Sequence, residues 1–246
     1  MTFRPCVTAL ALAIAATSAG VQAKEKNDDI IKISEWNYEA LYDKGGIQAD
    51  ELMDTEVFGS DGEEIGSVEN VIIGNDNKIV AIIAQVGGVW DIGDTHVAVP
   101  WKEVKMTDDG VRIPVTEDNA DDYGIFKNEY VTKSLEQTTK VEDDVDTGYR
   151  SWKLTNLLDD YATLTGGTGY GYVDNVIFSK DGKIEAVIVE SASTYGAGTY
   201  AYPFYGYDYG WNPGYDAYEL PYEENEVADL DIFDYNEFDD TWDWDS

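Results

Sequence analysis

The residues that most readily do chemistry in proteins are few or poorly arranged in this chain of 246 residues. His96 is the single histidine, so a histidine-based metal centre or a Ser-His-Asp triad has to be built around it. It begins a predicted strand, 96–99, and we interpret it as a surface or strand-edge residue. Paired carboxylates recur, yet acid–base catalysis needs two carboxyls whose environments separate their pKa values. The glycine-rich segment 166–171 lacks the Gly-Lys-Ser/Thr ending of a phosphate-binding loop. We therefore predict no catalytic residues, no enzyme activity and no cofactor.

Calcium is the more serious chemical candidate, because Asp-rich segments offer oxygen ligands. The nearest segment to a calcium-binding loop, 144–148, lacks the fifth ligand, the sixth-position glycine and the twelfth-position glutamate. The acidic tail, 239–245, either collects a cation loosely or is simply solvated. We predict no defined metal site and keep weak divalent-cation binding or buffering as the alternative function. A saline habitat, where salt screens self-repulsion, is a third explanation of the acidity.

The charge balance excludes one class of partner. The chain has 50 Asp plus Glu against 16 Lys plus Arg, a net charge of -34, and no basic residue follows Lys183. Because a phosphate-binding surface needs clustered Lys and Arg, nucleic-acid binding is excluded. The 43% hydrophobic and 13% aromatic content is high enough for folded cores, unlike that of an acidic disordered chain.

The first 23 residues have the pattern of a secretory signal. Arg4 precedes an apolar core at 7–16, and small residues occupy the cleavage positions at 21–23. That core is too short to span a membrane, so we predict a periplasmic protein and not an integral membrane protein. Cleavage after Ala23 removes Cys6, the only cysteine, which excludes disulfides and thiol chemistry.

An internal repeat dominates the remaining chain. Residues 66–84 and 171–189 align at a constant offset of 105, with ten of nineteen positions identical. In each copy, β-branched runs flank a polar turn, 75–77 in one and 180–182 in the other, which is typical of a tight hairpin. Short strands at this spacing favour a small barrel or sandwich. Only 128–140 suggests a short exposed helix or a linker.

Three motifs of the first copy, 59–68, 86–93 and 97–101, resemble the PRC-barrel family in order and spacing. The second copy departs from the pattern in the turn at 166–171 and in a Tyr- and Gly-rich stretch after Glu190. The resemblance implies an all-β protein of two tandem PRC-type barrels, used for assembly and contacts, with no shared catalytic residues. The layout is similar to that of exported bacterial tandem PRC-barrel proteins.

The aromatic stretch 195–222 exceeds what the first copy carries. The segment 202–204 takes the place of 99–101 and is expected to seal the second barrel. The remaining stretch, 205–218, either packs over the barrel or binds a partner, since Tyr and Trp are enriched in recognition surfaces. The predicted partner-binding residues are Tyr207, Tyr209, Trp211 and Tyr215.

The predicted organisation is a signal peptide (1–23), an N-terminal extension (24–48), barrel 1 (49–130), an acidic linker (131–148), barrel 2 (149–238) and an acidic-aromatic tail (239–246). We expect the barrels to be separate folding units. The leading function is a periplasmic protein-interaction or assembly module with an unidentified protein partner.

Export with cleavage after Ala23 predicts that the protein recovered from the producing cell begins at Lys24. Its intact mass is the direct measurement, because loss of the first 23 residues leaves a single defined species. A membrane-associated species that retains Met1 would contradict the prediction.

Overall fold

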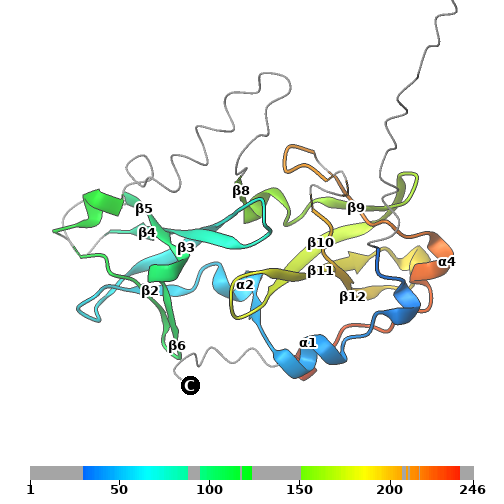
Figure 1. The fold of residues 1–246 in the computed structure, drawn as a ribbon, viewed down its shortest axis with the longest axis horizontal. Helices are drawn as coiled ribbons and strands as arrows, with labels where there is room; N and C mark the ends of the chain where they lie inside the picture. The colour runs from blue at the N-terminus through cyan, green and yellow to red at the C-terminus, as the bar shows by residue number, and fades with distance from the viewer. Residues whose placement is uncertain are drawn as a thin grey trace, which may run out of the picture. The chain divides into compact units, whose positions relative to one another are not determined.

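Two β-sheets account for most of the regular structure (Figure 1). The structure is a computed structural model that describes residues 30–87, 95–116, 118–123, 151–206, 209, 211–215 and 217–238. The predicted all-β class is confirmed, since strands dominate the described residues and each repeat forms its own sheet. The predicted signal peptide, linker, exposed helix and tail (1–23, 131–148, 128–140 and 239–246) lie outside these residues.

The first repeat builds a sheet with strand order β5-β4-β3-β2-β7-β6, and β8 also pairs with β3. Its strands are β2 (Glu56–Phe58), β3 (Glu64–Ile73), β4 (Ile79–Val86), β5 (Thr95–Pro100), β6 (Lys105–Thr107), β7 (Gly110–Arg112) and β8 (Trp152–Lys153). The second repeat has the order β12-β11-β10-β9-β13, and β1 also pairs with β10. Its strands are β1 (Ile47–Gln48), β9 (Tyr161–Leu164), β10 (Thr168–Phe178), β11 (Ile184–Ser191), β12 (Gly198–Pro203) and β13 (Ala217–Glu219).

The helices are short, and two of them precede the first strand. The α-helices are α1 (Glu39–Lys44), α2 (Ala49–Leu52) and α4 (Glu224–Val227). The 3₁₀ helices are η1 (Ile33–Glu35), η2 (Trp101–Glu103), η3 (Ala120–Tyr123), η4 (Leu154–Asn156), η5 (Ser193–Tyr195) and η7 (Tyr235–Glu237).

The two predicted hairpins, β3–β4 and β10–β11, are equivalent residue by residue. Their turns place Asn77 and Gly182 at φ values of 60° and 78°, a region that Asn and Gly tolerate. Gly66 and Gly171 allow a close approach of the paired strand in both copies. A Cβ would lie 1.8 Å from the Gln85 carbonyl oxygen in the first copy and 2.0 Å from that of Glu190 in the second.

The two halves exchange strands reciprocally. In β1, which precedes the first hairpin, Ile47 and Gln48 pair with Phe178 and Ile177 of β10. In β8, which precedes the second hairpin, Trp152 and Lys153 pair with Ile73 and Ile72 of β3. Each of these residues differs from its counterpart by the 105-residue repeat offset, so the exchange has the pattern of a two-fold relation within one chain.

Lys78 and Lys183, which are equivalent positions, form an antiparallel bridge with each other at the centre of this exchange. On either side, the Ile79 N–H donates to the Gly182 carbonyl at 2.8 Å, and the Ile184 N–H donates to the Asn77 carbonyl at 2.9 Å. We call the paired segments β1, β8 and these two turns the junction.

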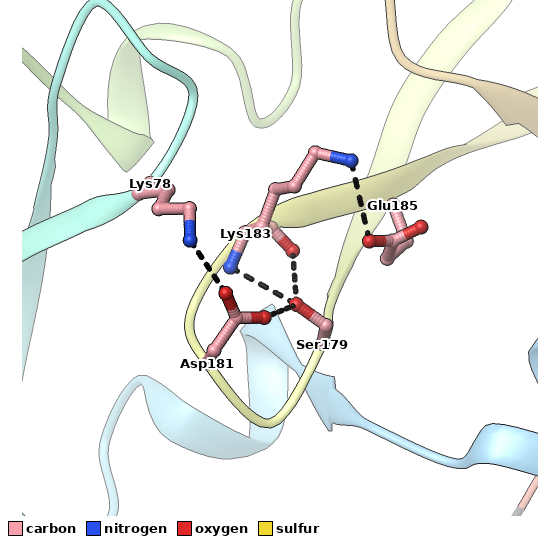
Figure 2. A network of polar contacts seen from close by, with 5 residues as sticks. All are labelled: Lys78, Ser179, Asp181, Lys183 and Glu185. Carbon is pink, nitrogen blue, oxygen red and sulfur yellow. Dashed lines mark hydrogen bonds and ion pairs between the residues drawn. The ribbon is translucent and has the colours of Figure 1, made fainter.

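A charged network lies on the junction (Figure 2). The Lys78 ammonium donates to Asp181 at 2.5 Å, and the Ser179 hydroxyl donates to the other oxygen of that carboxylate at 2.6 Å. The hydrogen bond from Lys78 is the main cause that lowers the pKa of Asp181. Both partners are exposed, and exposed ion pairs contribute about 0–1 kcal/mol. Backbone pairing and the burial of Ile47 and Trp152 therefore hold the junction more than this ion pair does.

The segment that precedes the first barrel packs on the second sheet. The Trp36 indole donates to the Ala201 carbonyl at 2.8 Å, and the Tyr38 hydroxyl accepts from the Ala201 N–H at 3.2 Å. Tyr38 and Leu41 share a buried cluster with Phe233 and Phe238 from the C-terminal side. Residues close to both ends of the described chain thus cover one face of β10–β12.

These contacts change the expectation of two separate folding units. Strands are exchanged, and the N-terminal segment crosses to the second sheet, so neither half contains all the residues that complete its own sheet. Ile31–Ser246 also forms one compact unit by its contacts. From these contacts we expect the two halves to unfold together.

Trypsin provides a test, because Lys133 and Lys140 lie in the predicted linker. Cleavage there is expected to leave two fragments that elute together from a size-exclusion column in native buffer, since the junction holds them. The same digest in concentrated urea should elute as separate fragments. Separate elution in native buffer would contradict the one-unit fold.

Candidate functional site: the tyrosines of the second barrel

The residues predicted to bind a partner have different environments. Trp211 is only 4% exposed, whereas Tyr215 is 59% exposed. Tyr209 is half-buried, and its ring contacts Tyr205 at a centroid distance of 4.6 Å. Tyr207 lies outside the described residues. The structure therefore does not gather the described members of this set on one exposed surface.

Trp211 belongs to an aromatic core cluster. Its ring lies 4.7 Å from Trp152, 6.0 Å from Phe204 and 6.1 Å from Tyr218, measured between centroids. Because its side chain is enclosed by these rings, it cannot act as an exposed anchor in this structure. For Trp211 the structure supports the packing interpretation of the aromatic stretch.

Tyrosines also fill the interior of the second barrel, and their hydroxyls pair with one another. The hydroxyls of Tyr170 and Tyr202 are 2.5 Å apart, and those of Tyr205 and Tyr222 are 2.9 Å apart. The Tyr222 hydroxyl donates to the Ile31 carbonyl at 2.9 Å, and the Tyr205 hydroxyl accepts from the Ile31 N–H at the same distance. These bonds satisfy hydroxyls that would otherwise be costly to bury.

Burial keeps these hydroxyls neutral. Desolvation is the main cause that raises the pKa of Tyr202, Tyr218 and Tyr222 far above the ordinary tyrosine value. A hydroxyl whose pKa is raised in this way cannot serve as a base near neutral pH. Tyr202 is also 0% exposed, which agrees with the expectation that 202–204 seals the second barrel.

Two other tyrosines, which the sequence analysis did not single out, are exposed side by side. Tyr161 on β9 and Tyr172 on β10 are register partners, 41% and 57% exposed, with ring centroids 5.4 Å apart. We call this pair the tyrosine surface. Across the sheet, Tyr172 is also paired with Glu190 on β11, an exposed carboxylate. The row thus combines aromatic rings with a negative charge.

The equivalent row of the first sheet contains no aromatic residue. Glu56 takes the place of Tyr161, Ser67 that of Tyr172 and Gln85 that of Glu190, with the same pairing. Because both sheets form the same ladder, pairing alone does not require tyrosine at these positions. A position-by-position comparison of the two copies could have found this pair from the sequence, because tyrosine occurs at both positions in the second copy only.

Part of the role of Tyr161 is structural. A Cβ at Gly169 would lie 1.8 Å from its hydroxyl, so the tyrosine side chain covers a glycine of the neighbouring strand. Aromatic side chains commonly stabilise strand glycines in this way. No contact of this kind accounts for Tyr172, which is the more exposed of the two.

The single histidine, His96, lies on β5 of the first sheet. Its Nε2 atom is 2.5 Å from a carboxylate oxygen of Glu69, and both side chains are about half exposed. This position fits the interpretation of His96 as a surface residue.

Within the described ranges, no three His, Cys, Asp or Glu side chains come together as a metal site. The two segments that suggested calcium, 144–148 and 239–245, lie outside those ranges. In the same part of the chain, no helix is long and apolar enough to cross a membrane.

Two hollows open on the second sheet. One, of about 500 Å³, is lined by Thr194 and Tyr195 of η5, by Glu224, Asn225 and Val227 of α4, and by Ala228. The other, of about 390 Å³, lies between α1 and the β10–β11 turn, next to the junction, with Trp36, Lys44 and Lys180 among its lining residues. Each combines exposed polar side chains with buried apolar ones, Val227 in the first hollow and Leu41 and Ile177 in the second.

Comparison with known families supports the motif resemblance. Residues 44–120 match the family model of the PRC-barrel domain. The first repeat is a PRC-barrel domain. That match covers the strands β1 to β7, and the second sheet repeats their pairing pattern. No curated protein matches the chain.

The packing role of Trp211 predicts a large stability difference between two of the candidate residues. Trp211→Ala is expected to lower the free energy of unfolding by about 3–5 kcal/mol, because it leaves a cavity among three rings. Tyr215→Ala, at an exposed position, should change it by about 0.5 kcal/mol or less. Urea denaturation measures both, and equal effects would contradict the assignment.

Proposed function

We propose that this protein is an exported, non-catalytic PRC-barrel protein that serves as a periplasmic protein-interaction or assembly module. The signal-like residues 1–23 support export. The PRC-barrel domain at 44–120 supports a role in contacts, since the family resemblance implies assembly and not catalysis. His96 lies beside Glu69 on an exposed part of the first sheet, and the buried tyrosines are neutral, so neither supports a catalytic role.

The single observation that carries the proposal is the tyrosine surface. The first copy closes the same ladder with Glu56 and Ser67, so Tyr161 and Tyr172 add exposed aromatic area beyond the needs of pairing. Tyrosine supplies contact area at a low cost in rotamer entropy and is enriched in recognition surfaces. A partner that covers both rings is therefore expected on the outer face of β9 and β10.

Divalent-cation binding or buffering remains the alternative and rests on composition. The net charge of -34 attracts cations diffusely, and salt weakens such attraction. The interaction role is our leading proposal because the tyrosine surface is a defined feature, whereas the segments that suggested calcium, 144–148 and 239–245, lie outside the described residues.

Matched substitutions of Tyr172 and Tyr215, which are about equally exposed, test whether the partner contact lies on the tyrosine surface. Tyr172→Ser is expected to lower the recovery of periplasmic partners by about tenfold, because an aromatic anchor typically contributes about 1–2 kcal/mol. Tyr215→Ser, 59% exposed against 57% for Tyr172, is the control of equal exposure. Recovery is measured by quantitative mass spectrometry after pull-down with the folded full chain, and melting temperatures confirm that both variants fold.

Loss with Tyr172→Ser alone supports the tyrosine surface. Loss with Tyr215→Ser alone would overturn that placement and return the contact to the stretch 205–218. Unchanged recovery with both variants would overturn a tyrosine-mediated contact on the second barrel.

A further inference from the structure

The hollow between η5 and α4 has a lining suited to a long cationic side chain. Val227, which is 3% exposed, and Ala228 provide an apolar wall, while Glu224 and Asn225 provide polar groups at the rim. Long basic side chains commonly lay an apolar stem on such a wall and keep the charged head at the rim. The volume of about 500 Å³ exceeds that of one side chain.

The charge of the surroundings selects a cation. No Lys, Arg or His follows Lys183, so Glu219 of β13 and Glu224 and Glu226 of α4 are the charged groups of these strands and this helix, and β12 has none. The segment η1 packs against α4, and the cation next to it, Lys32, is paired with Glu35 at 3.4 Å. Of the acids in the first turn of α4, Glu226 accepts a hydrogen bond from the Glu223 N–H at 2.9 Å and caps the helix. Glu224 lines the hollow instead.

Tyr195 connects this carboxylate to the aromatic residues. Tyr195 and Glu224 line the same hollow, and partial desolvation together with this carboxylate raises the pKa of Tyr195. Its ring lies 5.5 Å from that of Tyr170, measured between centroids. Tyr195 therefore links the lining of the hollow to the buried tyrosines of the second barrel.

We propose that the partner inserts an arginine side chain into this hollow, with its guanidinium on Glu224 and against the Tyr195 ring. This inference rests on the proposed interaction function and names the chemistry of the partner. Arginine fits better than lysine, because its planar guanidinium stacks on an aromatic face and binds a carboxylate with two parallel hydrogen bonds.

The test uses a capped hexa-arginine peptide and, as a neutral probe of matched shape, a capped hexacitrulline peptide. Binding to the full chain is measured by calorimetry at low ionic strength. Glu224→Gln keeps the shape of the hollow and is expected to weaken hexa-arginine binding by about fivefold, the upper range for an ion pair at an exposed carboxylate. Glu63→Gln, an exposed acid of the first barrel, removes the same charge and is expected to weaken binding less than about twofold.

Equal weakening by the two variants would overturn the proposal, since it would mean diffuse attraction by the whole chain. Equal binding of hexacitrulline and hexa-arginine would overturn it as well. If Glu224→Gln has no local effect while Tyr172→Ser still lowers partner recovery, the arginine assignment fails and the interaction function stands. Loss of both effects would remove the function and the inference together.

Discussion

The reciprocal pairing at the junction is the constraint on which the rest of this fold depends. Lys78 meets its own counterpart, Lys183, so each residue around this point must be compatible with the equivalent residue of the other copy. The strongest internal identity, between 66–84 and 171–189, covers the two hairpins that form the centre of the junction. Each hairpin must form its own backbone ladder and must also pair with a short strand of the other half. Symmetric contact thus gives a physical reason why the copies remain alike here and differ elsewhere.

Away from the junction, the interior of the second copy is rich in tyrosine, whereas that of the first copy is aliphatic. This difference affects the hydrogen bonding of the interior. A buried tyrosine needs a partner for its hydroxyl, and Tyr205 and Tyr222 find one partly in the backbone of Ile31. The N-terminal segment is therefore part of the second barrel, although it precedes the first in the sequence. The tyrosine interior and the crossing of the chain depend on each other, because the same segment completes the hydrogen bonding and covers the outer face of β10–β12.

The sequence predicted the features that depend on neighbouring residues. The hairpins, their Asn and Gly turns and the all-β class follow from β-branched runs and turn residues within a few positions of one another. The strand exchange could not be predicted, because Ile47–Gln48 and Trp152–Lys153 are too short to carry a pattern and their partners are over a hundred residues away. Aromatic density also could not separate Trp211, which is enclosed, from Tyr172, which is exposed. That distinction depends on strand register and on which face of the sheet is covered.

The position of the exposed tyrosines within an acidic surface has a physical advantage. A large apolar patch promotes association of like copies, whereas two tyrosines beside Glu190 form a small surface with hydrated edges. Two copies of a chain with a net charge of -34 repel each other, so the same rings are unfavourable for self-association and open to a partner of opposite charge. In the proposed interaction, the charge sets which encounters occur, and the rings supply contact once an encounter has formed. Under that proposal, this separation of roles accounts for aromatic residues where the first copy has Glu56 and Ser67, although the ladder beneath them is the same.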